Sequence, residues 1–119
     1  MATIKQTLDE LLTLDGAMCA SIVDSTSGMM LGAAGSGVDL EVAAAGNTEV
    51  VRAKMKTMRS LGLNDVIEDI LITLGKQYHL IRPLGRKEGV FIYFVLDKGK
   101  SNLALARRKL ADVERDITF

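Results

Sequence analysis

Apolar residues recur at intervals of three and four in three stretches of the chain, which is the spacing of helices that bury one face. Each stretch opens on a residue type that caps helix N-termini well: Thr3, Asp39 and Ser101. Gly62 follows the second stretch, where glycine readily takes the left-handed conformation that ends helices. The pattern therefore predicts helices over residues 3–14, 39–61 and 101–117.

Five shorter apolar runs have the composition of β-strands. "STSG" separates the first two runs and supplies turn residues, which predicts a hairpin. "VFIYFVLD" is apolar at nearly every position, so we expect it in the middle of a sheet with both faces covered. Pro83 lies near the end of its run, where a missing N–H is tolerated. The runs cover residues 17–24, 29–35, 69–74, 78–84 and 90–97.

The order of these elements is α-β-β-α-β-β-β-α. Three helices and five strands linked by hairpins predict an α+β sandwich around one five-stranded antiparallel sheet. The chain has 119 residues, 48% of them apolar, which is enough for a hydrophobic core without disulfides or metals. We expect residues 1–119 to form a single domain.

The helix predicted over residues 39–61 has more apolar surface than one stripe requires. At about 100° per residue, its apolar side chains form two neighbouring stripes, and Asn47 and Lys54 lie between them. One stripe has small residues that suit close packing on a sheet, and the other carries methionines, which are frequent at binding surfaces. Either the second stripe meets a partner, or the end helices and a curved sheet cover both stripes in a monomer. The stripes are Ala43, Gly46, Val50, Ala53 and Leu61, and Ala44, Val51, Met55 and Met58.

Charge and cysteine content exclude several classes of function. Fifteen Lys and Arg residues balance fifteen Asp and Glu residues, so the chain has no basic excess for binding nucleic acid or anionic lipid. The single cysteine, Cys19, cannot form an internal disulfide, and together with the lack of a signal peptide it favours the cytoplasm. No apolar run approaches the ~20 residues of a membrane-spanning helix.

Residues suited to catalysis or metal binding are scarce. His79 is the only histidine, and with Cys19 alone it supplies neither a catalytic triad nor a zinc site. "GAAGSG" at residues 32–37 matches neither the P-loop nor the dinucleotide fingerprint, and we interpret it as a flexible connection. We interpret residues 86–89 as a charged hairpin tip, and the basic residues of "ARRK" at 106–109 as part of a solvated helix face. We therefore expect no enzymatic activity, no cofactor and no metal site.

A resemblance to a known family extends over nearly the whole chain, and four segments carry it: "LDELLTLDGAMCASIVDSTSGMMLGAAG", "ILITLGKQYHLIRPL", "GVFIYFVLD" and "NLALARRKL". With the order of elements, they resemble the roadblock family, also called the dynein light chain roadblock-type family, which includes bacterial MglB-type proteins. The resemblance implies a three-layer α/β/α, profilin-like sandwich with strand order 2-1-5-4-3. The second helix would cover one face of the sheet and the other two helices the opposite face.

The same resemblance implies a function in protein–protein interaction. Members of the family form homo- or heterodimers by pairing the second helix and the third strand antiparallel, and their usual task is to scaffold or regulate Ras-like small GTPases. MglB-type members act as GTPase-activating proteins. For this chain the implied function is a non-enzymatic homodimer that binds and modulates such a GTPase. The implied dimer interface comprises Asn47, Val51, Lys54, Met55, Met58, Ile70, Ile72 and Leu74.

Two arginines are the candidates for contacting the partner GTPase. Arg82 and Arg86 flank a strand end, although neither stands out as an arginine finger. The alternative function is a small-ligand sensor, because profilin- and PAS-like sheets share this order of elements. The sequence has no cluster of aromatic or polar residues that would line a ligand pocket, and this favours the scaffold over the sensor.

Overall fold

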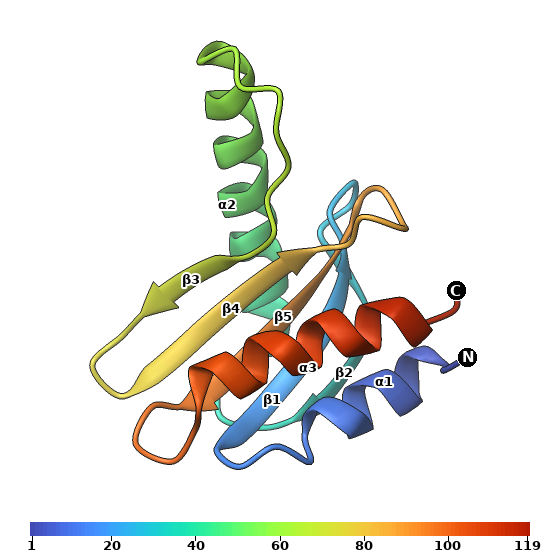
Figure 1. The fold of residues 1–119 in the computed structure, drawn as a ribbon, viewed down its shortest axis with the longest axis vertical. Helices are drawn as coiled ribbons and strands as arrows, with labels where there is room; N and C mark the ends of the chain where they lie inside the picture. The colour runs from blue at the N-terminus through green and yellow to red at the C-terminus, as the bar shows by residue number, and fades with distance from the viewer.

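The computed structural model describes residues 1–119 and has the eight elements in the order expected from the sequence (Figure 1). The helices are α1 (Ile4–Leu11), α2 (Leu40–Ser60) and α3 (Leu103–Asp116). The strands are β1 (Ala17–Asp24), β2 (Met29–Gly35), β3 (Ile70–Thr73), β4 (Gln77–Pro83) and β5 (Val90–Asp97). The predicted α+β class is confirmed.

Side chains fix where the first two helices begin. The hydroxyl of Thr3 accepts a hydrogen bond from the N–H of Gln6 at 3.1 Å, and the Gln6 side chain accepts one from the N–H of Thr3 at 2.9 Å. This reciprocal pair is a capping box. The carboxylate of Asp39 accepts hydrogen bonds from the N–H groups of Glu41 and Val42, as its expected capping role requires.

The expected cap of the third helix is wrong by one residue. Asn102 is the N-cap of α3, and its side-chain oxygen accepts a hydrogen bond from the N–H of Leu105 at 3.1 Å. Ser101 instead donates its hydroxyl to the carbonyl of Asp97 at 2.7 Å. The serine therefore closes the turn after β5, and the asparagine next to it is free to cap the helix.

All five strands form one antiparallel sheet with the order β2-β1-β5-β4-β3, as the family resemblance implies. β5 lies at the centre, and its residues from Val90 to Leu96 are all buried. This agrees with the continuous apolar run in the sequence, because a central strand is covered on both faces. β2 and β3 are the edge strands.

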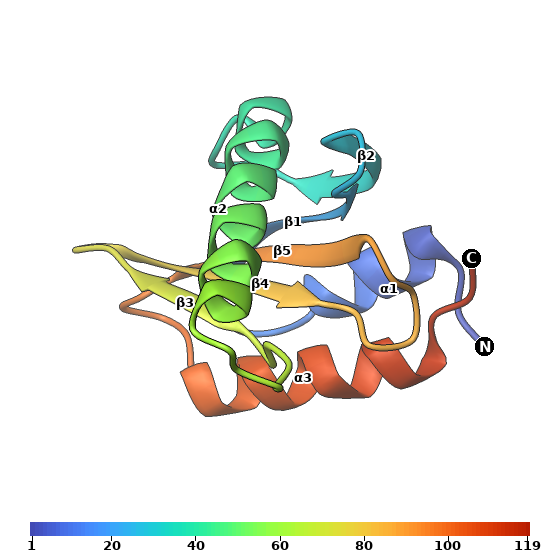
Figure 2. The ribbon, with the colours of Figure 1, turned by 90° about the horizontal axis from the view of Figure 1, so that it is seen from above.

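The sheet separates two hydrophobic layers (Figure 2). α1 and α3 cover one face, where Leu11, Phe94 and Leu110 belong to the larger cluster of buried side chains. α2 covers the other face, where Val51 and Tyr93 belong to a smaller cluster. The three-layer α/β/α arrangement is therefore confirmed, and α2 is the only helix on its side of the sheet.

Candidate interaction surface

The contact of α2 with the sheet comes mainly from residues of the stripe that carries the methionines, and not from the small-residue stripe. Ala44, Thr48 and Val51 are the buried residues of α2 and lie against the sheet, with Val51 only 3% exposed. Val50, from the small-residue stripe, is 36% exposed, and nothing lies within 4 Å of the position a Cβ would take on Gly46. The expectation that the small stripe faces the sheet is therefore wrong.

A buried threonine explains the error. The hydroxyl of Thr48 donates to the carbonyl of Ala44 at 2.8 Å, so its hydrogen-bonding need is met inside the helix. A polar residue can then occupy the middle of the sheet-facing stripe at little cost. Val51 lies on the same sheet-facing side of α2 as Thr48, so it packs in the core of its own chain. Of the implied interface on α2, only the residues that are not buried against the sheet are available to a partner.

The C-terminal half of α2 projects beyond the sheet (Figure 1). After Val51, every residue to Ser60 except Met58 is exposed. Residues 61–69, the returning segment, lead from α2 back towards β3. They carry further exposed apolar side chains at Leu61, Leu63 and Val66, with exposed fractions of 63%, 52% and 80%. An apolar surface of this kind usually marks an interaction site.

A groove of about 760 Å³ runs between α2 and the returning segment. Val50, Lys54 and Met58 line it from the helix. The opposite wall is formed by apolar and acidic residues from the segment and the start of β3: Leu63, Asp65, Val66, Ile67, Glu68, Asp69 and Ile70. The groove thus brings together three residues of the implied interface: Lys54 and Met58 from α2 and Ile70 from β3.

β3 offers an unpaired edge next to this groove. It pairs with β4 on one side only, through the register Ile70 with Ile81 to Thr73 with Tyr78. Ile70 and Ile72 are half-buried and pack against the cluster beneath α2. Leu74 lies outside β3, which ends at Thr73, and its N–H donates to the carbonyl of Gln77 in the turn. The strand boundary expected at residue 74 is therefore one residue too long.

Charge is segregated along α2. The N-terminal half and its cap carry acids, and the C-terminal half carries bases. Arg52 is partly engaged within the chain, because it donates to the carbonyls of Ser25 and Thr26 at 2.6 and 2.9 Å. The acids are Asp39, Glu41 and Glu49, and the bases are Arg52, Lys54, Lys56 and Arg59.

Both arginines expected to contact a partner have roles inside the molecule. The Nε of Arg82 donates to a carboxylate oxygen of Glu114 at 2.7 Å, and the N–H of Gly85 donates to the other at 2.8 Å. Arg86 donates to the backbone carbonyls of Glu114 and Arg115 at the end of α3. The two arginines therefore fasten the β4–β5 hairpin to α3.

A polar network lies between α2 and the sheet. His79 Nδ1 is 2.9 Å from the hydroxyl of Tyr93, and His79 Nε2 is 2.8 Å from the side-chain oxygen of Gln77. Burial lowers the pKa of His79, and burial is also the main cause that raises the pKa of Tyr93 to about 12. Neutral His79 accepts from Tyr93 and donates to Gln77, so this geometry orders side chains beneath α2.

The remaining residues considered for chemistry, Cys19 and the glycines of residues 32–37, have structural roles. Cys19 is buried, and burial raises the pKa of its thiol, which suits an unreactive side chain. Gly32 and Gly35 belong to β2, so the interpretation of residues 32–37 as a flexible connection is wrong for the first four residues. A Cβ on Gly32 would lie 2.5 Å from Ile4, which shows how closely α1 packs on β2.

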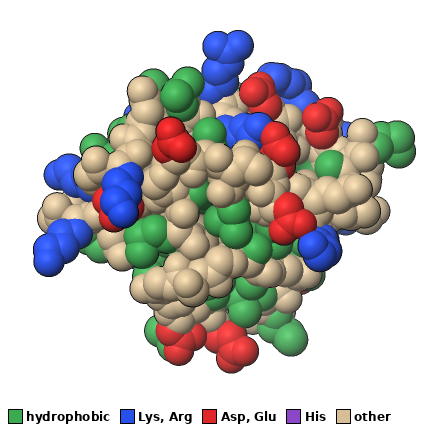
Figure 3. All heavy atoms as spheres, turned by 90° about the horizontal axis from the view of Figure 1, so that it is seen from below, with side chains coloured by type: hydrophobic (Ala, Val, Ile, Leu, Met, Phe, Trp, Pro, Cys, Tyr) green, Lys and Arg blue, Asp and Glu red, His purple; other side chains and the backbone are tan.

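One face of the molecule carries charges of both signs (Figure 3). Figure 3 shows basic and acidic side chains scattered among hydrophobic ones on the face seen from below. This matches the balance of fifteen basic and fifteen acidic residues in the chain. No helix is both long and apolar enough to cross a membrane.

Solved structures identify the architecture. No family model and no curated protein matches the sequence. A Roadblock/LC7 domain from Streptomyces avermitilis superposes with a TM-score of 0.83 at 11% identity, covering 97% of this chain and 94% of that one. Myxococcus xanthus MglB superposes with a TM-score of 0.82 at 19% identity, covering 95% of this chain and 89% of that one. Myxococcus xanthus MglC superposes with a TM-score of 0.63 at 14% identity, covering 95% of this chain and 94% of that one.

The sheet order and the placement of the helices define an α/β/α sandwich with one helix alone on its face. The chain has the Roadblock/LC7 fold, and its structural neighbours include MglB-type proteins over nearly their full length.

Proposed function

We propose that this chain forms a homodimer that binds a Ras-like small GTPase and regulates it without catalysing a reaction of its own. The observation that carries the proposal is the uncovered flank of α2 and its groove, on a fold shared with MglB. Proteins with this fold are typically non-catalytic. The family resemblance supplies the class of partner.

The dimer interface would be built on α2 and β3. From the implied set, Asn47, Lys54, Met55 and Met58 are at least partly accessible on α2. Ile70 and Ile72 would follow the pairing edge of β3, with Leu74 at its end. Val51 would support the interface from below, because its side chain is already buried against the sheet.

Antiparallel pairing of two α2 helices suits their charges. In that arrangement the basic C-terminal half of one helix lies beside the acidic N-terminal half of the other. Parallel pairing would place like charges together along the whole contact. The apolar residues Val50, Leu61 and Leu63 would then leave solvent, which supplies the main driving force for association.

Regulation of a GTPase requires unequal binding of its two nucleotide states. The switch loops of small GTPases change order with the bound nucleotide, and a partner that contacts them favours one state. Arg82 and Arg86 are tied to α3, so we do not assign them a direct role in hydrolysis. Any acceleration of hydrolysis would come from ordering the GTPase's own groups.

The test is a calorimetric titration of the chain with the small GTPase encoded nearest to its gene, loaded with GDP or with a non-hydrolysable GTP analogue. We expect binding, with affinities that differ by about fivefold or more between the two states. Equal affinity for both states would contradict regulation. If no small GTPase of the same organism binds, the proposed function is wrong.

A further inference from the structure

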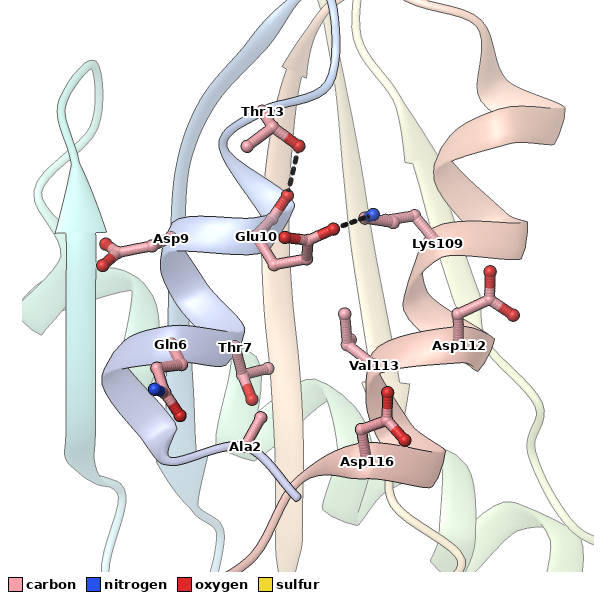
Figure 4. A pocket seen from close by; sticks show the side chains of 10 residues that line it. All are labelled: Ala2, Gln6, Thr7, Asp9, Glu10, Thr13, Lys109, Asp112, Val113 and Asp116. Carbon is pink, nitrogen blue, oxygen red and sulfur yellow. Dashed lines mark hydrogen bonds and ion pairs between the residues drawn. The ribbon is translucent and has the colours of Figure 1, made fainter.

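A second groove, of about 480 Å³, runs between α1 and α3 on the face of the sheet opposite α2 (Figure 4). Four carboxylates line it, those of Asp9, Glu10, Asp112 and Asp116, against the single ammonium of Lys109. Lys109 pairs with Glu10 and so joins the two helices. The groove therefore has an excess of acceptors over donors.

The other carboxylates are weakly committed. Asp9 pairs with Lys5 at 2.7 Å and Asp112 pairs with Arg115, but all four side chains are substantially exposed, so a better-placed cation can displace these pairs. Asp116 takes part in none of the ion pairs of the chain. It also lies four residues after Asp112 on the same face of α3, where two like charges repel each other.

The floor of the groove holds an unused hydroxyl. Thr7 is only 1% exposed, and its Oγ1 has no hydrogen-bond partner. Figure 4 shows its side chain between the two helices, pointing from α1 into the space that the carboxylates border. Buried polar groups in proteins are nearly always paired, so an orphaned hydroxyl beside an acidic groove points to a missing partner, and the hydroxyl oxygen can accept from a donor placed there.

We propose that this groove binds the guanidinium group of an arginine from a partner protein. Carboxylates and a hydroxyl acceptor favour a cation over an anion. A metal ion does not fit, because the chain has no group of three or more His, Cys, Asp or Glu side chains that could hold one. A guanidinium spreads five donors over a planar fork and can reach separated acceptors on two helices, whereas an ammonium is a compact point charge.

The site is independent of the proposed dimer. It lies on the α1 and α3 face, whereas the groove proposed for the second copy lies between α2 and β3. A homodimer would therefore present two such sites to solvent. The arginine site can exist whether or not the chain regulates a GTPase.

The test is a titration of the ¹⁵N-labelled chain with acetyl-Gly-Arg-Gly-amide, followed by amide chemical shifts. The controls are the citrulline peptide, which keeps the shape without the charge, and the lysine peptide. We expect saturable shifts at residues 6–10 and 112–116, with the arginine peptide binding about tenfold more tightly than the citrulline peptide. Equal affinity for arginine and citrulline, or for arginine and lysine, would overturn the proposal.

Three variants locate the site. Asp116→Asn should weaken binding of the arginine peptide about fivefold, whereas Asp65→Asn, a carboxylate in the other groove, should leave it unchanged. Thr7→Val keeps the side-chain shape and removes the orphaned hydroxyl, so it should weaken binding about threefold without lowering the thermal midpoint. If the Asp65→Asn loss equals that of Asp116→Asn, or if Thr7→Val binds normally, the assignment fails.

Discussion

At the scale of single residues, His79 carries a charge-sensitive contact in the layer under α2. Its pKa is lowered by burial, so the folded chain binds a proton there less readily than the unfolded chain. The contribution of neutral His79 is complete above the unfolded pKa of about 6.5 and is lost as the pH falls below it. Protonation would also prevent Nδ1 from accepting the hydrogen bond of Tyr93.

We therefore expect the free energy of unfolding to fall between pH 7.5 and pH 5.5, and to fall less in His79→Gln. Glutamine keeps polar atoms in the layer but does not titrate. Urea unfolding at the two pH values measures the difference. Equal losses in the parent chain and the variant would show that other groups control the acid sensitivity.

Arg82 is the residue whose role the structure changes most. Its pair with Glu114 has side-chain exposures of 21% and 12%, so the pair is largely removed from solvent. Arg82→Ala would leave the carboxylate of Glu114 without its charged partner, and we expect a loss of about 2 kcal/mol in the free energy of unfolding. Denaturant titration measures this loss.

Lys5→Ala is the matched control for Arg82→Ala, because it breaks the exposed pair with Asp9. We expect that change to cost less than about 0.5 kcal/mol. A similar small cost for Arg82→Ala would mean that Glu114 finds solvent or another donor when the arginine is absent.

At the scale of elements, α2 shows both what the sequence predicts and where it fails. The extent of the helix follows from Asp39 at one end and Gly62, with a φ of +69°, at the other. The side of the helix that faces the sheet could not be predicted, because the partner of the Thr48 hydroxyl is a backbone carbonyl that no apolar pattern reveals. The same limit applies to Arg82, whose partner Glu114 lies 32 residues away.

The strands were predictable for a different reason. Continuous apolar runs such as residues 90–97 have few alternatives to a covered central strand, and their order follows from the hairpins and the family resemblance. The groove between α1 and α3 was not predictable. Its residues come from opposite ends of the chain, and the bridge Ala2–Ile117 that brings these ends together depends on the finished fold.

The overhang of α2 leads to a prediction on local stability. Residues 44–51 are held by the sheet, whereas residues 52–60 have little of their own chain to pack on. We expect amide hydrogen exchange in residues 52–60 to speed up on dilution, while residues 44–51 stay protected, because only the overhang would depend on a second copy. Exchange that is independent of concentration in both halves would contradict a dimer built on this helix.

At the scale of the whole molecule, the fold leaves one face incompletely covered. α1 and α3 cover their side of the sheet, but α2 alone covers the other side and extends past it. The free edge of β3 lies beside the exposed flank of α2. A second copy placed antiparallel would cover the flank and extend the sheet at once, which makes the dimer the assembly that best accounts for both features.

Val50→Glu tests this assembly directly. Val50 lines the groove between α2 and the returning segment. In a symmetric dimer with its two-fold axis near this helix, each subunit places its new carboxylate in the apolar contact, so the interface receives two charges. We expect the dissociation constant of the dimer to rise at least about a hundredfold, since two buried charges cost several kcal/mol. Sedimentation equilibrium over a range of concentrations measures it.

Val42→Glu provides the matched control, because Val42 lies on the same helix, is 69% exposed and lies outside the groove. Its dimer should be at least as tight as that of the parent chain, because the new carboxylate lies in the acidic half of α2, beside the basic half of the second copy. Salt adds an independent check on orientation. Antiparallel helices place opposite charges side by side, so raising the ionic strength from 0.05 to 0.5 M, which shortens the screening length roughly threefold, should weaken the dimer. A dimer that tightens with salt would require the like-charged halves to lie together, and the parallel arrangement would then replace the one proposed.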